Sequence, residues 1–386
     1  MDRRKFIRVV GGVSIAAATI SSAGCAQRMP ASAIASWRGP GHEADVRRWI
    51  LGYAILAPHS HNLQSWLVDL RTPDEILLRC DTSRLLPEAD PFSRQIMISH
   101  GAFLELLDMA SRECGLRADI SLFPEGQFTA VDIDQRPVAR IRLVADSTLV
   151  REPLFTQILK RRTNRESYEL TRPIAPDTWL AMADSVKPNL LQFGHVGPDQ
   201  PGLLQQHRKL AAEAWRIELT TARVVLETYS VLRIGAAEVE LHRDGMALLD
   251  GVPVLMSTLG MFNRHISPAA DDYAVTSQIR DFNSRLASTP AFLWLITPDN
   301  DRQTQINAGR AFVRIQLAAS AAGVSLQPLS QALQEYSEQA QSYAEIRRLL
   351  ELSQPGQTVQ MWARAGFAPA IGPAPRRGVD AQLVRA

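Results

Sequence analysis

The sequence predicts an α+β protein, and three observations support that prediction. Apolar runs at 65–70 and 75–81 flank a turn-forming link, which is typical of an antiparallel hairpin. Apolar residues recur at helical spacing over 94–114 and again over 308–322. A continuous apolar run at 291–297 has the length of a buried strand. This mixture of antiparallel hairpins and long helices indicates the α+β class.

The remaining elements of the first part of the chain follow from spacing and from helix-ending residues. A helix is expected over 41–56, where apolar residues fall at helical spacing before Pro58. A strand is expected at 139–145, because apolar and polar residues alternate there. A short helical run should follow Pro153.

In the second part, a helix should open at Pro176, since proline suits the first helical position. Residues 203–233 are expected to be helical over their whole length. Residues 234–290 have turn residues but no clear period, so they are interpreted as an irregular insertion or lid. The helix over 308–322 should end at Gly323, and the run at 357–367 should form the last strand. No internal sequence repeat is found.

Composition and charge narrow the class of protein. With 386 residues and 46% hydrophobic content, the chain can bury one large core or two modest ones. Its mean hydropathy of -0.10 is that of a globular protein. The formal net charge is +2, and the arginines are spread along the chain. Nucleic acid is therefore not an expected partner, because no basic stripe is present.

Residues 1–33 have the composition of a targeting segment. The twin arginines Arg3 and Arg4 precede an apolar stretch rich in Gly, Ala, Ser and Thr, which is typical of a twin-arginine export signal. The alternative of a single transmembrane helix is disfavoured, because the apolar run falls short of about 20 residues. Cleavage after Ala33 is one expected outcome, and lipidation of Cys25 in "SAGC" is the other.

The export signal carries functional information. It predicts the twin-arginine export machinery as a partner and the periplasm or cell envelope as the destination. Because this route moves folded proteins, it also indicates a cofactor inserted before export. Beyond the signal only Cys80 and Cys114 remain, too few for a disulfide framework, and whether they pair is left open.

The sequence lacks the motifs of several common enzyme classes. The chain contains no GxGxxG, P-loop, GxSxG, CxxC or HExxH pattern, which weakens hydrolase and dinucleotide-fold hypotheses. His59 and His61 stand two apart in a loop, but no Cys, Asp or Glu cluster accompanies them. A metal site is therefore not expected.

The segment "APHSHNLQSW" at 57–66 resembles the "APSSHNxQPW" block of the nitroreductase superfamily, and more narrowly of its Acg-type branch of flavin mononucleotide (FMN)-binding oxidoreductases. Four further blocks resemble that family in the same order, and the resemblance covers nearly everything after residue 33. These blocks are "RLLPEADPFSRQIMISHGAFLELL" (84–107), "KRRTNRESYE" (160–169), "AAGVSLQPLSQAL" (321–333) and "PAPRRGVDAQLV" (373–384).

The resemblance implies a nitroreductase-like fold with two halves in one chain, forming an intramolecular pseudo-dimer. Residues 34–386 would make one FMN-binding unit, with an N-terminal half at 34–150 and a C-terminal half at 151–386. The region at about 234–290 would be a lid-like insertion in the second half. A monomer that acts as a pseudo-dimer is the expected state.

The resemblance also implies a set of cofactor-binding residues and no catalytic side chain. The loop that contains the histidines would lie against one side of the flavin ring, and the arginines would meet the phosphate, since guanidinium forks suit phosphate oxygens. The implied residues are Pro58, His59, Ser60, Asn62, Arg94, Arg161, Thr163, Arg165, Pro328, Ser330, Gln331, Arg376 and Arg377.

Within this set, five residues have specific expectations. Arg94 would face the pyrimidine edge, where positive charge raises the flavin potential; the alternative is a solvated helix residue. The backbone amide of Ser330 or Gln331 would donate to N5. Arg376 and Arg377 would meet the phosphate, the alternative being a disordered basic tail. Trp66 is expected in the core, as aromatic residues at strand starts usually pack.

The function implied by the resemblance is an exported FMN-dependent oxidoreductase that exchanges hydride or electrons through flavin N5 with small-molecule donors and acceptors. The main alternative is a flavin-sequestering or storage protein, in which the lid covers the ring and little turnover occurs. A third possibility is a lipid-anchored partner-binding protein with a vestigial site.

Overall fold

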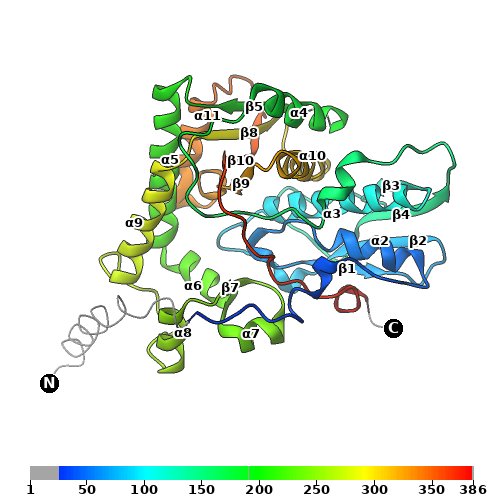
Figure 1. The fold of residues 1–386 in the computed structure, drawn as a ribbon, viewed down its shortest axis with the longest axis horizontal. Coiled ribbons are helices and arrows are strands. Elements are labelled where there is room, and N and C mark those ends of the chain that lie inside the picture. Colours follow the sequence, from blue (N-terminus) through cyan, green and yellow to red (C-terminus); the bar gives the residue numbers. More distant parts are fainter. Residues whose placement is uncertain (1–25, 190, 385–386) are drawn as a thin grey trace.

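The structure is a computed structural model that describes residues 26–189 and 191–384, and its fold is α+β in two halves (Figure 1). Each half contains one four-stranded sheet in which every neighbouring pair is antiparallel. The strand orders are β1-β2-β4-β3 and β5-β8-β10-β9, so both sheets place their strands in the order first, second, fourth, third. The two halves therefore share one topology, as the resemblance implied.

The N-terminal half is built from four strands and two α-helices. They are α2 (Val46–Ala54), β1 (Trp66–Asp69), β2 (Glu75–Cys80), α3 (Arg94–Glu113), β3 (Leu116–Leu122) and β4 (Pro137–Ala145). Short 3-10 helices lie at Ala35–Arg38, Ser60–Asn62, Thr82–Arg84 and Pro153–Gln157.

The C-terminal half repeats this series with one long insertion. Its repeated elements are α4 (Pro176–Val186), β5 (Gln192–Val196), β8 (Ala291–Thr297), α10 (Arg302–Ala321), β9 (Ser325–Pro328) and β10 (Thr358–Gly366). Helix α11 (Ala340–Leu349) lies between β9 and β10, and 3-10 helices lie at Lys187–Asn189, Gln331–Leu333, Ser337–Gln339 and Val379–Gln382.

The insertion separates β5 from β8, where the N-terminal half has only a short turn between β1 and β2. Helices α5 and α9 stand along one side of the second sheet, and the smaller elements continue beneath them in Figure 1. The elements are α5 (Pro201–Thr220), α6 (Ala222–Ser230), β6 (Leu232–Ile234), α7 (Gly235–His242), β7 (Met246–Leu248), α8 (Gly251–Thr258) and α9 (Tyr273–Ala287).

The halves meet where α3 crosses α10, and two glycines make the crossing close. A Cβ at Gly101 would lie 1.9 Å from the carbonyl oxygen of Ile306, and one at Gly309 would lie 1.8 Å from that of Ile98. Each glycine stands seven residues after the first residue of its helix. The crossing is therefore symmetric, and only glycine fits at either backbone contact.

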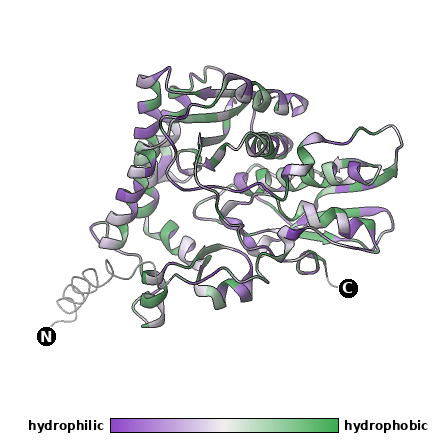
Figure 2. Ribbon diagram, viewed as in Figure 1, coloured by the Kyte–Doolittle hydropathy of each residue, from purple (hydrophilic) through white to green (hydrophobic). Residues whose placement is uncertain are grey.

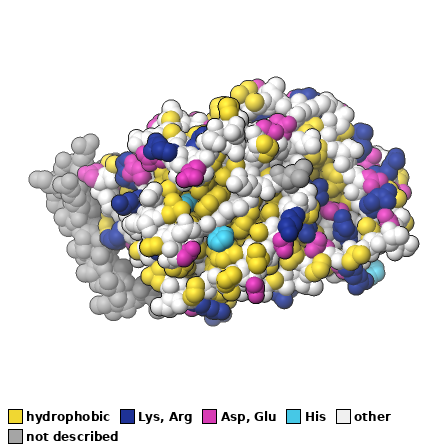
Figure 3. Space-filling model, turned by 90° about the horizontal axis from the view of Figure 1, so that it is seen from above, with side chains coloured by type: hydrophobic (Ala, Val, Ile, Leu, Met, Phe, Trp, Pro, Cys, Tyr) yellow, Lys and Arg dark blue, Asp and Glu magenta, His cyan; other side chains and the backbone are white. Residues whose placement is uncertain are grey.

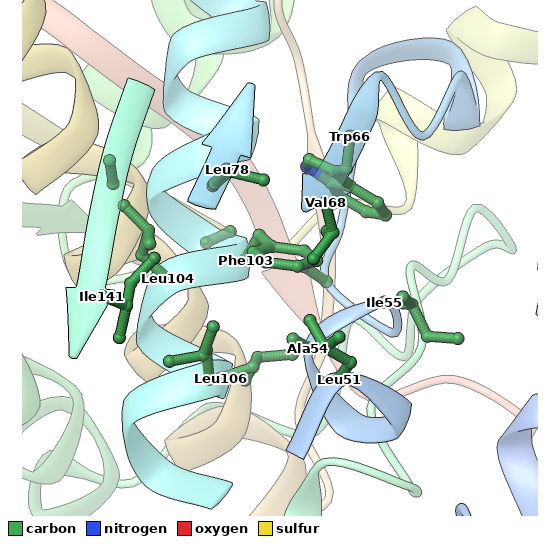
Figure 4. Close-up of a cluster of buried hydrophobic side chains, with 14 of the residues drawn as sticks. Leu51, Ala54, Ile55, Trp66, Val68, Leu78, Phe103, Leu104, Leu106 and Ile141 are labelled. Atoms are coloured by element: carbon green, nitrogen blue, oxygen red, sulfur yellow. The ribbon is translucent and has the colours of Figure 1, made fainter. Parts of the chain in front are cut away.

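The largest core belongs to the N-terminal half and extends into α10. Figure 4 shows residues of α2, β1, β2, α3 and β4 converging, with Trp66 and Phe103 at a centroid distance of 5.0 Å. Ile306 and Val313 of α10 pack into the same cluster. Figure 2 shows hydrophobic residues along the strands and α10 and polar residues on the outer helices. Trp66 is buried, so its predicted place in the core is confirmed.

Each end of the described chain contacts a part of the molecule that is distant from it in sequence. The tail after β10 runs to the N-terminal half, where Leu383 forms a parallel bridge with Val68 of β1. Near the other end, the backbone N–H of Gln27 donates to the carbonyl of Leu249 in the insertion at 2.9 Å. Ala33 is buried and its carbonyl accepts from the tail. The segment from residue 26 to 33 is thus part of the fold.

Most of the expected elements are confirmed, including the hairpin, both long helices and the strands β4, β8 and β10. The helix expected over 41–56 is shorter, because Asp45 caps it by accepting from the N–H of Arg47. The expected continuous helix over 203–233 is interrupted at Thr221, whose backbone is extended. The prediction that 234–290 is irregular is wrong, since three helices lie there.

The described residues contain no helix that is long and apolar enough to cross a membrane. On the face seen in Figure 3, basic and acidic side chains are interspersed rather than gathered by sign. The twin arginines, the apolar stretch and Cys25 lie outside the described residues.

Candidate functional site

The loop before β1 has an unusual backbone. His61, Asn62 and Gln64 have φ of 48°, 55° and 55°, in the left-handed region. Each such residue costs about 1–3 kcal/mol and persists only where the surroundings hold it. Strained residues of this kind cluster at ligand sites. The loop is therefore a candidate site on its geometry alone.

Hydrogen bonds from neighbouring elements hold this loop. Nε2 of His59 lies 2.9 Å from Oγ of Ser65, and its ring meets the edge of Trp66 at a centroid distance of 5.2 Å. Ser60 Oγ donates to Oε1 of Gln95 at 3.2 Å. Burial lowers the pKa of His59 well below its usual value. The His59 ring is therefore neutral and serves to position the loop.

Three arginines surround the Trp37 ring beside the loop. The guanidinium carbons of Arg161, Arg162 and Arg376 lie 5.6, 4.3 and 5.3 Å from the ring centre. The negative face of an indole attracts such cations. Arg161 comes from the segment that joins the two halves and Arg376 from the C-terminal tail, and both are buried. The cluster therefore assembles from distant parts of the chain.

The two buried arginines donate to neutral oxygens. Arg161 donates to the carbonyl of Leu56 at 3.1 Å, and Arg376 donates to the carbonyl of Ala57 at 3.0 Å. Arg376 also donates to Oδ1 of Asn62. In the part of the chain that the structure describes, neither arginine forms an ion pair with a carboxylate. Their positive charge is thus not balanced by the protein.

The unbalanced charge has measurable consequences. Burial away from water, together with repulsion between neighbouring arginines, lowers the pKa of Arg161 and of Arg376 to about 9. The Nε–H of each is buried without an acceptor. Leaving a buried cation uncompensated is costly, and a bound anion would remove that cost. The cluster therefore has the chemistry of an anion site, and phosphate matches its guanidinium forks.

Arg165 lies next to the loop. Its side chain is exposed to solvent, yet burial by the surrounding chain lowers its pKa, with added repulsion from Arg285. Burial and the charge of Arg165 together lower the pKa of His61 to about 4. Arg165 and His61 are therefore near enough for their charges to interact.

The end of β9 borders the same region. The backbone N–H of Asn164 donates to the carbonyl of Leu326 at 3.2 Å, and Arg364 donates from Nε to Oε1 of Gln327 at 2.6 Å. The backbone N–H of Ser330 pairs with no backbone carbonyl in the described residues. This amide is consequently available to a ligand.

The structure thus brings together the loop at 58–62, the segment at 161–165, the end of β9 and Arg376. Thr163 is partly exposed in this segment, and Pro328 is partly exposed at the last position of β9. The side chain of Gln331 turns to α5, donating to Oε1 of Glu218 at 3.3 Å. Only the backbone of Gln331 remains for the predicted contact.

Arg94 is not left free for a ligand. It is buried at the start of α3, and its Nε lies 3.3 Å from Oε2 of Glu335. Its other nitrogens donate to the carbonyls of Leu333, Val359 and Gln360. Arg94 therefore joins α3 to the second half of the chain. The alternative of a solvated helix residue is wrong, and the predicted role at a flavin edge has no free nitrogen to perform it.

Arg377 is also occupied by protein groups. Its backbone N–H donates to Oε1 of Gln64 at 2.9 Å, and its guanidinium donates to the Gln64 carbonyl at 2.5 Å and to Gln382 at 2.9 Å. Burial lowers its pKa to about 10. The tail is therefore fixed to the loop, so the alternative of a disordered basic tail is wrong.

A turn of the insertion, residues 243–245, docks on the same loop. Asn62 Nδ2 donates to the carbonyl of Gly245 and the Gly245 N–H donates to the carbonyl of Asn62, both at 3.1 Å. Buried Asp244 accepts from Arg84 at 2.5 Å and from Arg233 at 2.9 Å. The insertion is thus tied directly to the candidate site.

Sequence reasoning missed Trp37 and the Asp244 ion pairs. Trp37 stands among few apolar neighbours just after the targeting segment, and its isolation was the only signal. Asp244 lies in "HRDG", whose turn composition conceals a buried carboxylate. Both act through partners distant in sequence, which spacing does not reveal.

Neither metal nor disulfide chemistry is indicated by the described residues. No three His, Cys, Asp or Glu side chains gather there as metal ligands. Cys80 and Cys114 are free thiols, and Cys80 is buried at the end of β2.

Comparisons with known proteins agree with the resemblance in the sequence. No family model matches the chain. A Mycobacterium tuberculosis (strain H37Rv) protein, provisionally named NAD(P)H nitroreductase Rv3131, is 26% identical over 348 residues, covering 87% of this chain and 90% of its own. The names of such relatives support the nitroreductase superfamily as the broad class.

Solved structures give a more distant likeness. An FMN- and NADPH-dependent nitroreductase NfnB from Sphigopyxis sp. strain HMH has a TM-score of 0.38 and 17% identity, covering 61% of this chain and 99% of its own. The FMN-dependent NfnB from Mycobacterium smegmatis, in complex with NADPH, has a TM-score of 0.34 and 17% identity, covering 59% and 95%. No correspondence between residues follows from likeness at this level.

Proposed function

We propose that this chain is an FMN-dependent oxidoreductase of the nitroreductase type, with one flavin held at the junction of its halves. The observation that carries the proposal is the pair of buried arginines, Arg161 and Arg376, whose charge no carboxylate balances. A phosphate monoester is the ligand that this pair fits, and FMN ends in one. Relatives named as nitroreductases support the same class.

The residues that would hold FMN have distinct tasks. Arg161 and Arg376 would bind the phosphate. The Trp37 ring, over which both guanidiniums lie, would hold them in position. Arg165 would face the ring next to His61, whose pKa burial lowers to about 4. The free N–H of Ser330 is the amide that would orient the ring edge.

When bound, the flavin supplies hydride or electron transfer at N5. The chain's own contribution is binding, orientation and exclusion of water. Because His59 and His61 are neutral, neither is a ready proton donor at neutral pH. That no side chain acts as an acid or base is thus kept as part of the proposal.

A second candidate function is flavin storage, and the docked insertion favours it. The turn at 243–245 bonds to the loop through both backbone groups of Gly245, and its buried Asp244 pairs with Arg84. A cover held this firmly would hinder a second substrate. Bleaching of the flavin bands by NAD(P)H, followed by reoxidation with a quinone or nitroaromatic, would support the enzyme; a flavin that stays oxidised would support storage.

Export by the twin-arginine route to the periplasm or cell envelope remains part of the proposal. Cleavage after Ala33 would cut a buried segment whose carbonyl accepts from Arg376 N–H at 2.8 Å. Processing at Cys25 would leave the folded segment intact, so we propose that site over Ala33. Mass spectrometry of the mature N-terminus distinguishes the two.

The decisive test compares FMN with riboflavin, which lacks the phosphate. We expect the full chain to bind FMN at least about a hundredfold more tightly, because each charge-assisted hydrogen bond contributes about 1.5–3 kcal/mol. Arg161→Gln with Arg376→Gln should remove most of that preference and change riboflavin affinity little. Fluorescence quenching titrations of each flavin give both constants.

The control is Arg151→Gln with Arg280→Gln, which removes two exposed arginines and the same charge. It should bind FMN as the unmodified chain does. Equal affinities for FMN and riboflavin in the unmodified chain would disprove the phosphate site.

A further inference from the structure

Helix α8 carries an exposed apolar face. Val252, Leu255 and Leu259 follow one another at helical spacing, and each is more than half exposed. Met261 and Ile266 continue this exposed series after the helix. No residue of α8 is buried. A helix of a soluble domain normally buries its apolar stripe against a core, so this face lacks the usual partner.

The segment that forms this face contains no charged residue. Residues 251–263 contain no Asp, Glu, Lys or Arg. The next cation, Arg264, is held by Glu238 at 2.6 Å. Whatever covers the face is therefore recognised by apolar contact, with little contribution from ion pairs.

The N-terminal end of the described chain lies beside α8, on the side of Val254 and Thr258 rather than on the exposed apolar face. The backbone N–H of Gln27 bonds to the carbonyl of Leu249, and its side chain accepts from the N–H of Ala236 at 2.5 Å. Figure 1 shows the segment from residue 26 running along α8, β7 and α7. Cys25, the position of the proposed lipidation, stands two residues before Gln27.

We propose that the apolar face of α8, with the loop to Ile266, rests on the surface of a lipid bilayer. Gln27 is fixed beside α8, so a lipid on Cys25, which is part of the proposed function, would bring α8 to the membrane surface. An amphipathic helix lying in the interface buries its apolar side chains among the lipid acyl chains. Because this face lacks free cations, its binding needs no anionic lipid.

This proposal is independent of the flavin. It assigns α8 a second contact that cooperates with the N-terminal segment, since one weak anchor gives only reversible attachment and two give stable attachment. The membrane would then touch the insertion whose turn at 243–245 docks on the site loop.

The test uses the full chain and vesicles of phosphatidylcholine, with and without phosphatidylglycerol. The variant is Val252→Ser, Leu255→Ser and Leu259→Ser. The matched control is Val150→Ser, Leu170→Ser and Leu180→Ser, which replaces the same residue types at exposed positions elsewhere. Sedimentation gives the partition coefficient of each, and hydrogen exchange follows residues 251–262.

We expect the α8 variant to partition at least about tenfold less than the control, in both lipids and at high salt, as three buried aliphatic side chains are lost. Vesicles should slow exchange over 251–262 in the unmodified chain. Equal partition together with unchanged exchange would overturn the proposal. A concentration-dependent dimer that the α8 variant loses, with no effect of lipid, would instead assign the face to a second copy of the chain.

Discussion

Trp37 shows how one residue makes an unfavourable cluster tolerable. Three guanidiniums lie around its ring, and two of them are buried without a counter-charge. The attraction of each cation to the indole offsets part of the repulsion among them. Replacement of Trp37 by leucine would keep the volume apolar and remove that attraction.

We therefore expect Trp37→Leu to lower thermal stability mainly when no phosphate ligand is present. The bound anion would take over the role of the ring in balancing the arginines. Melting temperatures measured with and without excess FMN check this, with Trp49→Leu as the control, since no guanidinium lies over that ring. An equal loss with and without FMN would contradict the explanation.

His207 gives a prediction for pH. Its ring is buried among Phe292, Trp294 and Trp362, and burial lowers its pKa from 6.5 to about 4. Between these values the unfolded chain binds a proton that the folded chain does not. Stability contributed by neutral His207 is therefore present above pH 6.5 and is lost as pH falls toward 4.

We expect the free energy of unfolding to fall by about 1–2 kcal/mol more between pH 7 and pH 5 in the unmodified chain than in His207→Gln. Glutamine does not titrate, and its Oε1 can accept from Trp362 Nε1 as the ring nitrogen does at 3.1 Å. Urea unfolding at both pH values measures the difference. The same pH dependence in both proteins would show that His207 is not the titrating group.

At the scale of elements, the crossing of α3 and α10 controls how the halves meet. Gly101→Ala would place a methyl group 1.9 Å from the carbonyl oxygen of Ile306. The helices would have to separate, and overpacking of this kind costs about 1–3 kcal/mol. Gly309→Ala should have a similar effect, because it stands at the equivalent contact.

The control is Gly202→Ala in α5, where a Cβ meets no atom within 4 Å. Alanine should be neutral or stabilising there, since it favours helix over glycine by about 1 kcal/mol. Chemical denaturation of the three variants ranks them. A crossing variant as stable as Gly202→Ala would mean that the helices move apart without cost.

The sequence predicted those elements that bury one face, because burial produces a regular spacing of apolar residues. The strands β1 and β2 and the helices α3 and α10 have this spacing. The helices α7 and α8 were not predicted; α8 buries no residue, and its apolar side chains face outward. The shared topology of the halves was implied only by the family resemblance and not by an internal repeat, since few positions beyond Arg94 and Arg302, or Gly101 and Gly309, carry the same residue.

The site could be predicted only in part. Resemblance placed Arg161 and Arg376 in one site, and the structure brings them together at Trp37. It also placed Arg94 there, but carbonyl groups and Glu335 occupy that guanidinium. Whether a buried arginine is free for a ligand depends on hydrogen-bond partners from distant segments, and a local sequence pattern does not reveal those partners.

For the whole molecule, Asp244 links the insertion to the rest of the chain. It is buried between Arg84 and Arg233. Asp244→Asn would leave Arg233 without a carboxylate and Arg84 with Asp81 alone, and breaking a buried pair costs about 3–5 kcal/mol. We expect amide exchange over 59–65 and 243–248 to become at least about a hundredfold faster, with the sheets unchanged.

Asp250→Asn is the matched control, because that exposed carboxylate caps no backbone N–H. If both variants exchange at the rate of the unmodified chain, the bonds of the turn to Asn62 and Gln64 are sufficient to hold it. If Asp244→Asn also speeds flavin release, the insertion controls access to the site.

The presence of two halves of the same topology in one chain affects how the protein can evolve. In an assembly of two identical subunits, every mutation appears twice, so a change that improves one copy of a surface also alters the other. Here Arg94 and Arg302 begin equivalent helices but are encoded separately, and only one half carries the long insertion. Each half can therefore diverge independently, one toward ligand contact and the other toward support, without a compromise between the two.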